Sequence, residues 1–117
     1  MRQFCDAFNR EDLSTLDELW TSPFVYVMNS ETKKYAKYRD FANFEKLRAS
    51  GWAQTRFDDT QVLIQDTTSA VVNVKLVRLK IDNTELASGN FTVVLTKQSD
   101  QWKIRLGINH SNLPVGR

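Results

Sequence analysis

The sequence predicts an α+β fold, in which N-terminal helices pack on a strongly curved, mainly antiparallel sheet built by the C-terminal half. Two patterns predict it. In much of the first half, apolar residues recur at spacings of three and four, which is typical of helices. Beyond about residue 60, strand-like apolar runs are separated by short polar turns, which is typical of antiparallel strands. With 117 residues, 41% hydrophobic and 26% charged, the chain is long enough to bury a core, and we expect a single domain over residues 1–117.

Two short helices are expected at the start of the chain. Phe4, Ala7 and Phe8 lie on one side of a helix that is already under way at the first residue. A second apolar stripe runs over residues 13–20. Pro23 ends this second helix, because its ring and its missing N–H prevent continuation.

A strand, a loop and a longer helix are expected next. Residues 24–28 are β-branched or aromatic and predict a first strand. Residues 29–34 are polar and predict a loop. Residues 37–50 carry a helical stripe, and Gly51 follows where a left-handed helix end is expected.

The second half predicts a meander of strands over residues 60–65, 70–81, 90–97 and 102–110. In the longest run the apolar side changes near Lys75, which predicts a bulge or a bend at that point. The last run alternates, and Gly107 is expected to ease a bend in it. Its predicted shared face consists of Trp102, Ile104, Leu106, Ile108 and His110.

The order of these elements, and several local phrases, resemble the NTF2-like superfamily. Residues 4–13 resemble a first-helix phrase in which an Ala-Phe pair precedes a polar break and Asp-Leu. Residues 19–27 resemble the second helix that leads into the first strand. Residues 90–104, with Asn-His-Ser at 109–111, resemble the closing hairpin of the SnoaL-like members. The likeness extends over essentially the whole chain, although the first helix of the family is usually longer.

The resemblance implies a cone: a bent sheet whose concave side, covered by the helices, encloses a pocket. Members of the superfamily include ketosteroid isomerase and polyketide cyclases. They also include binding and assembly domains without catalytic activity, such as NTF2 itself and the association domain of a calcium/calmodulin-dependent kinase. The fold therefore leaves the function open.

The carboxylates that the catalytic members use are missing from this sequence. In those members an Asp at the end of the first strand acts as the base, and the resemblance places that position at about Met28. The last strand has no acid between Trp102 and His110. His110, the sole histidine, is the best single candidate for proton transfer near neutral pH. Its alternative role is that of a histidine at the solvent edge or bonded to a backbone carbonyl in the core.

Aromatic residues are concentrated before residue 58, either as ordinary core or as the lining of a hollow for a ligand. Asn73 lies between valines, and its amide needs a partner from a neighbouring strand or from a ligand. The candidate ligand-binding residues are Phe8, Tyr26, Met28, Phe44, Trp52, Asn73 and His110.

Composition and charge argue against several other classes of protein. The net charge is only +2, so we expect no nucleic-acid or membrane surface. No apolar run reaches the length of a membrane span, and one cysteine favours a reducing, cytoplasmic compartment. No ligand spacing for a metal and no cofactor motif is found. The basic residues of the strands are expected on a solvated face; they are Lys75, Arg78, Lys80, Lys97, Lys103 and Arg105.

Two main hypotheses for the function follow. In the first, the protein binds or slowly transforms a small, largely apolar molecule inside the cone. In the second, it is an association module, because strands that are apolar on both faces favour a homodimer through the outer face of the sheet. A purely structural domain with a vestigial pocket is a third reading. Whether the protein is an enzyme stays open.

Overall fold

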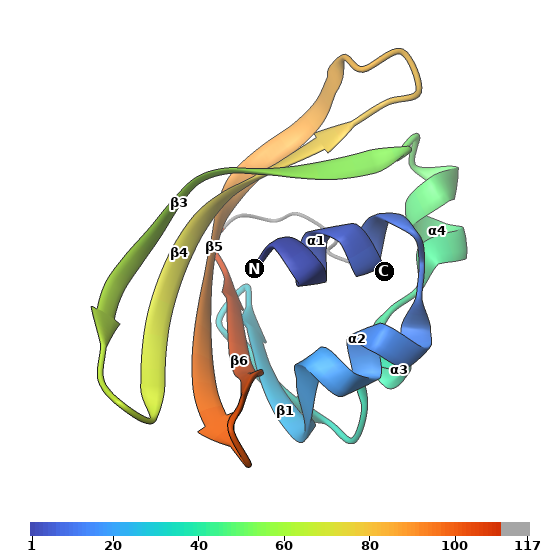
Figure 1. Ribbon diagram of the computed structural model, residues 1–117. Coiled ribbons are helices and arrows are strands. Elements are labelled where there is room, and N and C mark those ends of the chain that lie inside the picture. The colour runs from blue at the N-terminus through green and yellow to red at the C-terminus, as the bar shows by residue number, and fades with distance from the viewer. Residues whose placement is uncertain (111–117) are drawn as a thin grey trace.

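The structure is a computed structural model that describes residues 1–110, and it has the predicted α+β architecture. A curved sheet of six strands wraps around the helices, which lie on its concave side (Figure 1). The strand order is β2-β1-β6-β5-β4-β3; neighbours are antiparallel except β1 and β6, which run parallel. The helices are α1 (Arg2–Asn9), α2 (Leu13–Leu19), α3 (Tyr38–Phe41) and α4 (Phe44–Ala49). The strands are β1 (Trp20–Met28), β2 (Glu31–Tyr35), β3 (Gln54–Gln65), β4 (Ser69–Leu79), β5 (Glu85–Gln98) and β6 (Gln101–Asn109).

The two predicted N-terminal helices are confirmed, and their apolar stripes face the sheet. Phe4, Ala7 and Phe8 of α1 are buried in the core. Asp12 begins α2, since its carboxylate accepts a hydrogen bond from the backbone N–H of Thr15 at 3.2 Å. The chain therefore turns between α1 and α2, and Asp12 caps the first turn of α2.

Two predictions for residues 20–35 need correction. Strand β1 begins at Trp20 rather than at residue 24, with Pro23 inside it. The predicted loop over residues 29–34 contains β2, an edge strand that is exposed over most of its length and so shows no apolar alternation. Asn29 and Ser30 both have positive φ and form the tight turn between β1 and β2.

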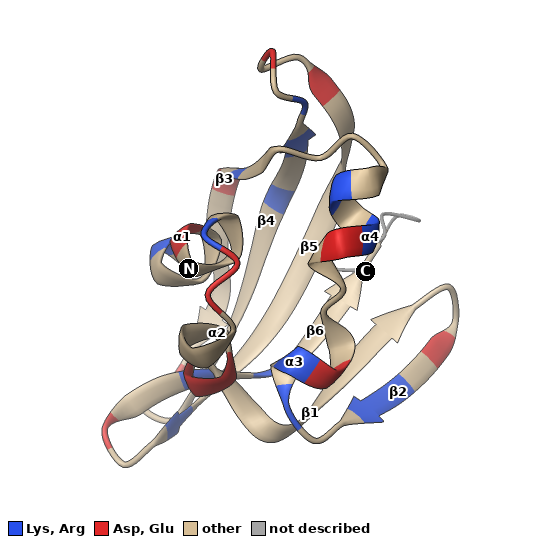
Figure 2. Cartoon of the chain, turned by 90° about the vertical axis from the view of Figure 1, so that its right-hand side faces the viewer, with Lys and Arg blue, Asp and Glu red and all other residues tan. Residues whose placement is uncertain are grey.

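The predicted helix over residues 37–50 is divided into α3 and α4. Asn43 lies between them, and its side chain accepts a hydrogen bond from the Lys46 N–H at 3.0 Å. This is an N-cap, so the residue that interrupts one helix begins the next. Charged residues of both signs lie on α3, α4 and β2 (Figure 2).

The pairing of β4 with β5 has no register shift near Lys75, where a bulge or a bend was predicted; the extra residues are in the neighbouring strand β3. The pairing of β4 with β5 is continuous from Ser69 to Arg78. One register shift lies between Asp58 and Gln61 of β3, opposite Lys75 and Asn73, and a second lies between Val62 and Ile64. A bulge of this kind increases the local twist, which curves the sheet around the helices.

The predicted single face of β6 is wrong because the register of β5 and β6 shifts. Leu95 is opposite Ile104, whereas Val94 is opposite Leu106, so Arg105 is an extra residue in β6. Trp102 and Ile104 therefore face the helices. Beyond the bulge, the even-numbered residues of β6 lie on the outer face of the sheet instead.

Candidate functional site

The concave side of the sheet and the helices enclose a core that is dominated by aromatic rings. Tyr26 of β1 lies beside Phe41 of α3, with ring centroids 4.4 Å apart, and beside Phe91 of β5 at 6.0 Å. Trp20 lies 5.0 Å from Tyr38. Aromatic walls of this kind suit an apolar ligand when a few polar groups converge between them.

One charged side chain, Arg78, is buried in this aromatic core. It lies on β4 in alternation with Val72, Val74 and Leu76, which belong to the core cluster, and only 1% of it is exposed. This corrects the expectation that Arg78 belongs to a solvated face. Its Nε and Nη2 atoms have no hydrogen-bond partner within residues 1–110. A buried guanidinium without a partner is costly, so this position needs a physical explanation.

Among residues 1–110, no acid compensates the charge of Arg78. Burial lowers the pKa of Arg78 to about 10, while the neighbouring Tyr26 and Tyr38 act in the opposite direction. Burial also raises the pKa of Tyr38 well above its ordinary value, with a smaller contribution from Tyr26. At neutral pH the guanidinium is therefore positively charged and the Tyr38 phenol is neutral.

Two further donors of the same aromatic core are also unsatisfied in the described part of the chain. These are the hydroxyl of Tyr38 and the indole Nε1–H of Trp20. Tyr38 is fully buried and Trp20 is 1% exposed, so solvent does not supply their partners directly. The cluster thus presents hydrogen-bond donors in an apolar enclosure, which is an arrangement that binds an acceptor group.

A small hollow opens beside this cluster, between β1, β2 and α3. Its enclosed volume is about 20 Å³. That is space for about one water molecule, so a ligand would have to displace side chains at the rim. The hollow is lined by Tyr26, Met28, Glu31, Lys33, Tyr35 and Phe41.

The candidate ligand residues from the sequence fall into three separate places. Tyr26 and Met28 meet at this hollow, as expected from their shared face. Phe8, Phe44 and Trp52 instead pack on one another, with centroids 4.9 to 6.0 Å apart, and form closed core under α4.

Asn73 and His110 lie on the outer, convex face of the sheet and not in the cone. The Thr92 hydroxyl donates to Asn73 Oδ1 at 3.1 Å and lies 2.7 Å from His110 Nε2. Since the single Thr92 proton is directed to Asn73, the His110 Nε2–H donates to Thr92 Oγ1. The neighbouring strand is therefore the partner that Asn73 needed, and the bulge at Arg105 is the reason that His110 is outside.

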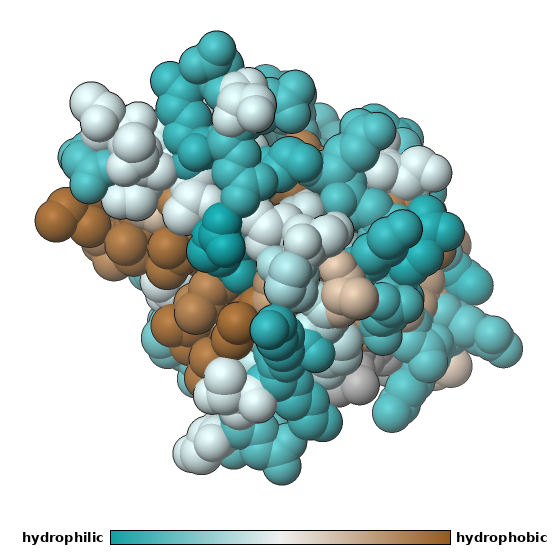
Figure 3. All heavy atoms as spheres, turned by 90° about the horizontal axis from the view of Figure 1, so that it is seen from below, coloured by the Kyte–Doolittle hydropathy of each residue, from teal (hydrophilic) through white to brown (hydrophobic). Residues whose placement is uncertain are grey.

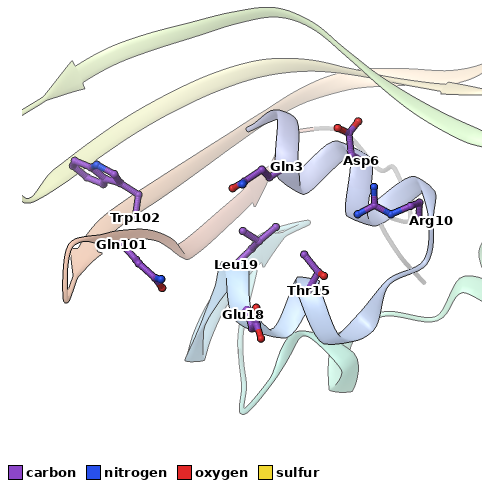
Figure 4. A pocket seen from close by; sticks show the side chains of 8 residues that line it. All are labelled: Gln3, Asp6, Arg10, Thr15, Glu18, Leu19, Gln101 and Trp102. Carbon is purple, nitrogen blue, oxygen red and sulfur yellow. The ribbon is translucent and has the colours of Figure 1, made fainter.

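An open groove lies elsewhere, between α1, α2 and the hairpin of β5 and β6, with a volume of about 650 Å³. Figure 4 shows its side chains spread around an open space rather than converging. Two of them are engaged with Asp12, since Thr15 donates to it at 2.7 Å and Arg10 pairs with it at 3.9 Å. The groove is lined by Gln3, Asp6, Arg10, Thr15, Glu18, Leu19, Gln101 and Trp102.

Next to this groove lies an apolar hollow of about 480 Å³, on the inner face of the sheet at the open end of the cone. Val62, Val72, Leu95 and Trp102 are among its lining residues. Figure 3 shows apolar atoms gathered on this side of the molecule, seen from below. These residues were not among the candidates predicted from the sequence; Trp102 and the alternation of β4 were the available signals.

Metal binding and membrane insertion are two further kinds of function on which the described residues bear. Among residues 1–110 no group of three or more His, Cys, Asp or Glu side chains is placed to hold a metal ion. Within the same residues, none of the helices has the length and apolar character needed to cross a membrane.

Solved structures with the same fold come from several bacteria, all at low sequence identity. A protein of unknown function from Mycobacterium tuberculosis has a TM-score of 0.73 at 17% identity over 93% of this chain; the match spans 65% of that protein. An NTF2-like protein with a cystatin-like fold from Novosphingobium aromaticivorans has a TM-score of 0.72 at 16% identity, over 99% of this chain and 80% of that one. An NTF2-like protein of unknown function from Shewanella oneidensis has a TM-score of 0.67 at 17% identity, over 92% and 90%.

These likenesses establish the fold, and the sequence itself establishes the family. A search among curated proteins gave no match. The model of a protein family described as "NTF2-like protein (DUF6841)" matches residues 1–112, which include every helix and strand described above. The chain is thus a member of the NTF2-like family DUF6841.

Proposed function

We propose that this protein binds a small, largely apolar molecule inside the cone, at the donor cluster formed by Trp20, Tyr38 and Arg78. The observation that supports the proposal most strongly is the set of buried donors without partners in the described chain. Aromatic walls with a few polar groups suit a small apolar molecule, and the hollow of about 20 Å³ beside them has to widen to admit one. The hollow at Tyr26 and Met28 marks the point of entry, and flexible Met28 is suited to moving aside.

The open-end hollow at Trp102 is larger but supports the proposal less well. Its lining combines exposed side chains, such as Val62 at 58%, with polar groups at its edge. The buried donors that lack partners are in the cone and not among its lining residues. Specific binding there would depend mainly on apolar contact, with only the polar groups at the edge to orient a ligand.

The three tryptophans provide a direct test, since each reports on a different region. Trp20 belongs to the donor cluster, Trp52 donates to Thr55 Oγ1 in the closed core, and Trp102 lines the open end. In a ¹H–¹⁵N spectrum titrated with benzamide, we expect the indole N–H signal of Trp20 to shift and those of Trp52 and Trp102 to stay in place.

Two controls sharpen this titration. Tyr26→Ala should weaken the binding of benzamide, whereas His110→Ala on the outer face should leave it unchanged. A shift confined to Trp102 would place the ligand at the open end instead. The absence of any shift at millimolar benzamide would mean that the cone does not bind such a molecule.

A second function, homodimer formation, is favoured by the outer face of the sheet. Half-buried apolar side chains from four strands lie together there, because each alternates with a residue of the inner core. A continuous apolar area of this kind is typical of interaction surfaces. Its main members are Val25, Val27, Val71, Val94, Leu106 and Ile108.

The dimer is expected to bury about 1,200 Å² or more in total and to persist at tens of micromolar. Ile108→Glu should convert it to a monomer in sedimentation velocity, since the new carboxylate would lie within the apolar face. Ile81→Glu is the matched control, because Ile81 is already 92% exposed in the turn after β4. A wild-type monomer at these concentrations would contradict this second function.

A further inference from the structure

The charge of Arg78 defines the chemical class of the ligand more narrowly than its apolar surroundings do. We infer that the molecule bound in the cone carries a carboxylate group, which pairs with the guanidinium of Arg78 while an apolar body lies against the aromatic rings. This inference rests on the proposed function, because it concerns the same site.

The first step is that Arg78 has no counter-ion in the described chain. In every ion pair of residues 1–110 the basic side chain is at least 48% exposed, and Arg78 takes part in none of them. The ionisable residues that influence its pKa are Tyr26 and Tyr38, and neither is a carboxylic acid. Glu31, at the rim of the hollow, is 70% exposed and pairs with Lys33 at 3.7 Å.

The second step is that water alone does not compensate a buried cation. The hollow beside Tyr26 has room for about one water molecule. A water molecule can accept a hydrogen bond but carries no charge. A cation of this kind is normally paired with an anion when it is removed from bulk solvent. An anionic ligand supplies both the acceptor atoms and the missing charge.

The third step concerns the shape of the anion. The unpaired atoms of Arg78, Nε and Nη2, form one edge of the planar guanidinium. In Arg56 the same edge binds the carboxylate of Asp58, with distances of 2.9 and 3.1 Å to its two oxygens. The same edge of Arg78, which has no partner among the described residues, therefore has the geometry to bind the carboxylate of a ligand. A single negative charge balances the guanidinium, whereas a doubly charged phosphate would leave excess charge in an apolar enclosure.

The test compares benzoate with benzamide, which have nearly the same shape and differ in charge. Both are titrated into the full chain while the Trp20 indole signal is followed. We expect benzoate to bind at least about 10-fold more tightly, as charge-assisted hydrogen bonds are the stronger ones. Arg78→Met should abolish this preference, and Arg78→Lys, which retains the charge without the planar edge, should retain only part of it. The spectrum of each variant also shows whether it is folded.

The outcomes separate the two proposals. Equal affinities for benzoate and benzamide, both with a Trp20 shift, would overturn the carboxylate inference and leave the cone as a ligand site. A benzoate preference that survives in Arg78→Met would show that another cation binds the carboxylate, and would likewise overturn it. If neither compound moves the Trp20 signal, the proposed function fails together with the inference.

Discussion

Replacing Arg78 with methionine is expected to raise the free energy of unfolding of the ligand-free protein by about 1 to 3 kcal/mol. The substitution removes a buried charge and buried donors that lack partners in the described chain, and it keeps a flexible apolar side chain of similar length. The measurement is urea denaturation at pH 7, with and without benzoate. The variant should be more stable than the wild type without benzoate and should gain less stability when benzoate is added.

The difference in stability between Arg78→Met and the wild type depends on pH in a defined direction. Burial lowers the pKa of Arg78 to about 10 in the folded protein, below its value in the unfolded chain, so between these two values the unfolded state binds more protons. The stability contribution of Arg78 therefore rises with pH across this range. The advantage of Arg78→Met should be constant below about pH 9 and shrink above pH 10.

Arg56→Met is the matched control for this prediction, because Arg56 is exposed and pairs with Asp58 at the surface. It should change stability little. A clear loss of stability in Arg78→Met would contradict the account, since it would mean that the guanidinium makes favourable contacts in the folded protein.

Replacing Gly107 with alanine is expected to lower the free energy of unfolding by about 1 to 3 kcal/mol. A Cβ at this position would lie 3.0 Å from Trp20 Cη2 and 3.1 Å from Phe91 Cζ. Both rings are almost fully buried, so neither has free space into which to move. Thermal or urea denaturation of the variant measures the loss.

The companion variant for Gly107 removes the contacting atom. Trp20→Phe lacks Cη2, so Gly107→Ala should cost less in that background than in the wild type, with Trp20→Phe alone as the reference. If Gly107→Ala is as stable as the wild type, then Gly107 does not face the core. The register that brings Asn109 inside and His110 outside would then be wrong as well.

Local patterns predicted most of the architecture. Both the helical stripe of Phe4, Ala7 and Phe8 and the strand runs after residue 60 are local patterns. They can therefore be recognised from the sequence without knowledge of the tertiary structure. The edge strand β2 was missed because both of its faces are polar. The division between α3 and α4 was missed because Asn43 is compatible with a helix until its side chain caps a new one.

The candidate site was predicted only in part, for a specific reason. Tyr26 and Met28 follow from simple alternation in β1, but the inward position of Arg78 conflicts with the usual exposure of arginine. Its alternation with Val72, Val74 and Leu76 was the available signal. His110 was placed in the pocket because one bulge residue, Arg105, reverses every later side chain of β6, and a bulge is not visible in the alternation of one strand.

A crystal structure of the protein grown with benzoate tests the central claim most directly. The account predicts a carboxylate in the cone with its oxygens about 2.7 to 2.9 Å from Nε and Nη2 of Arg78 and its ring against Tyr26. A structure in which another group of the same chain occupies those two nitrogens, with benzoate absent from the cone, would contradict it.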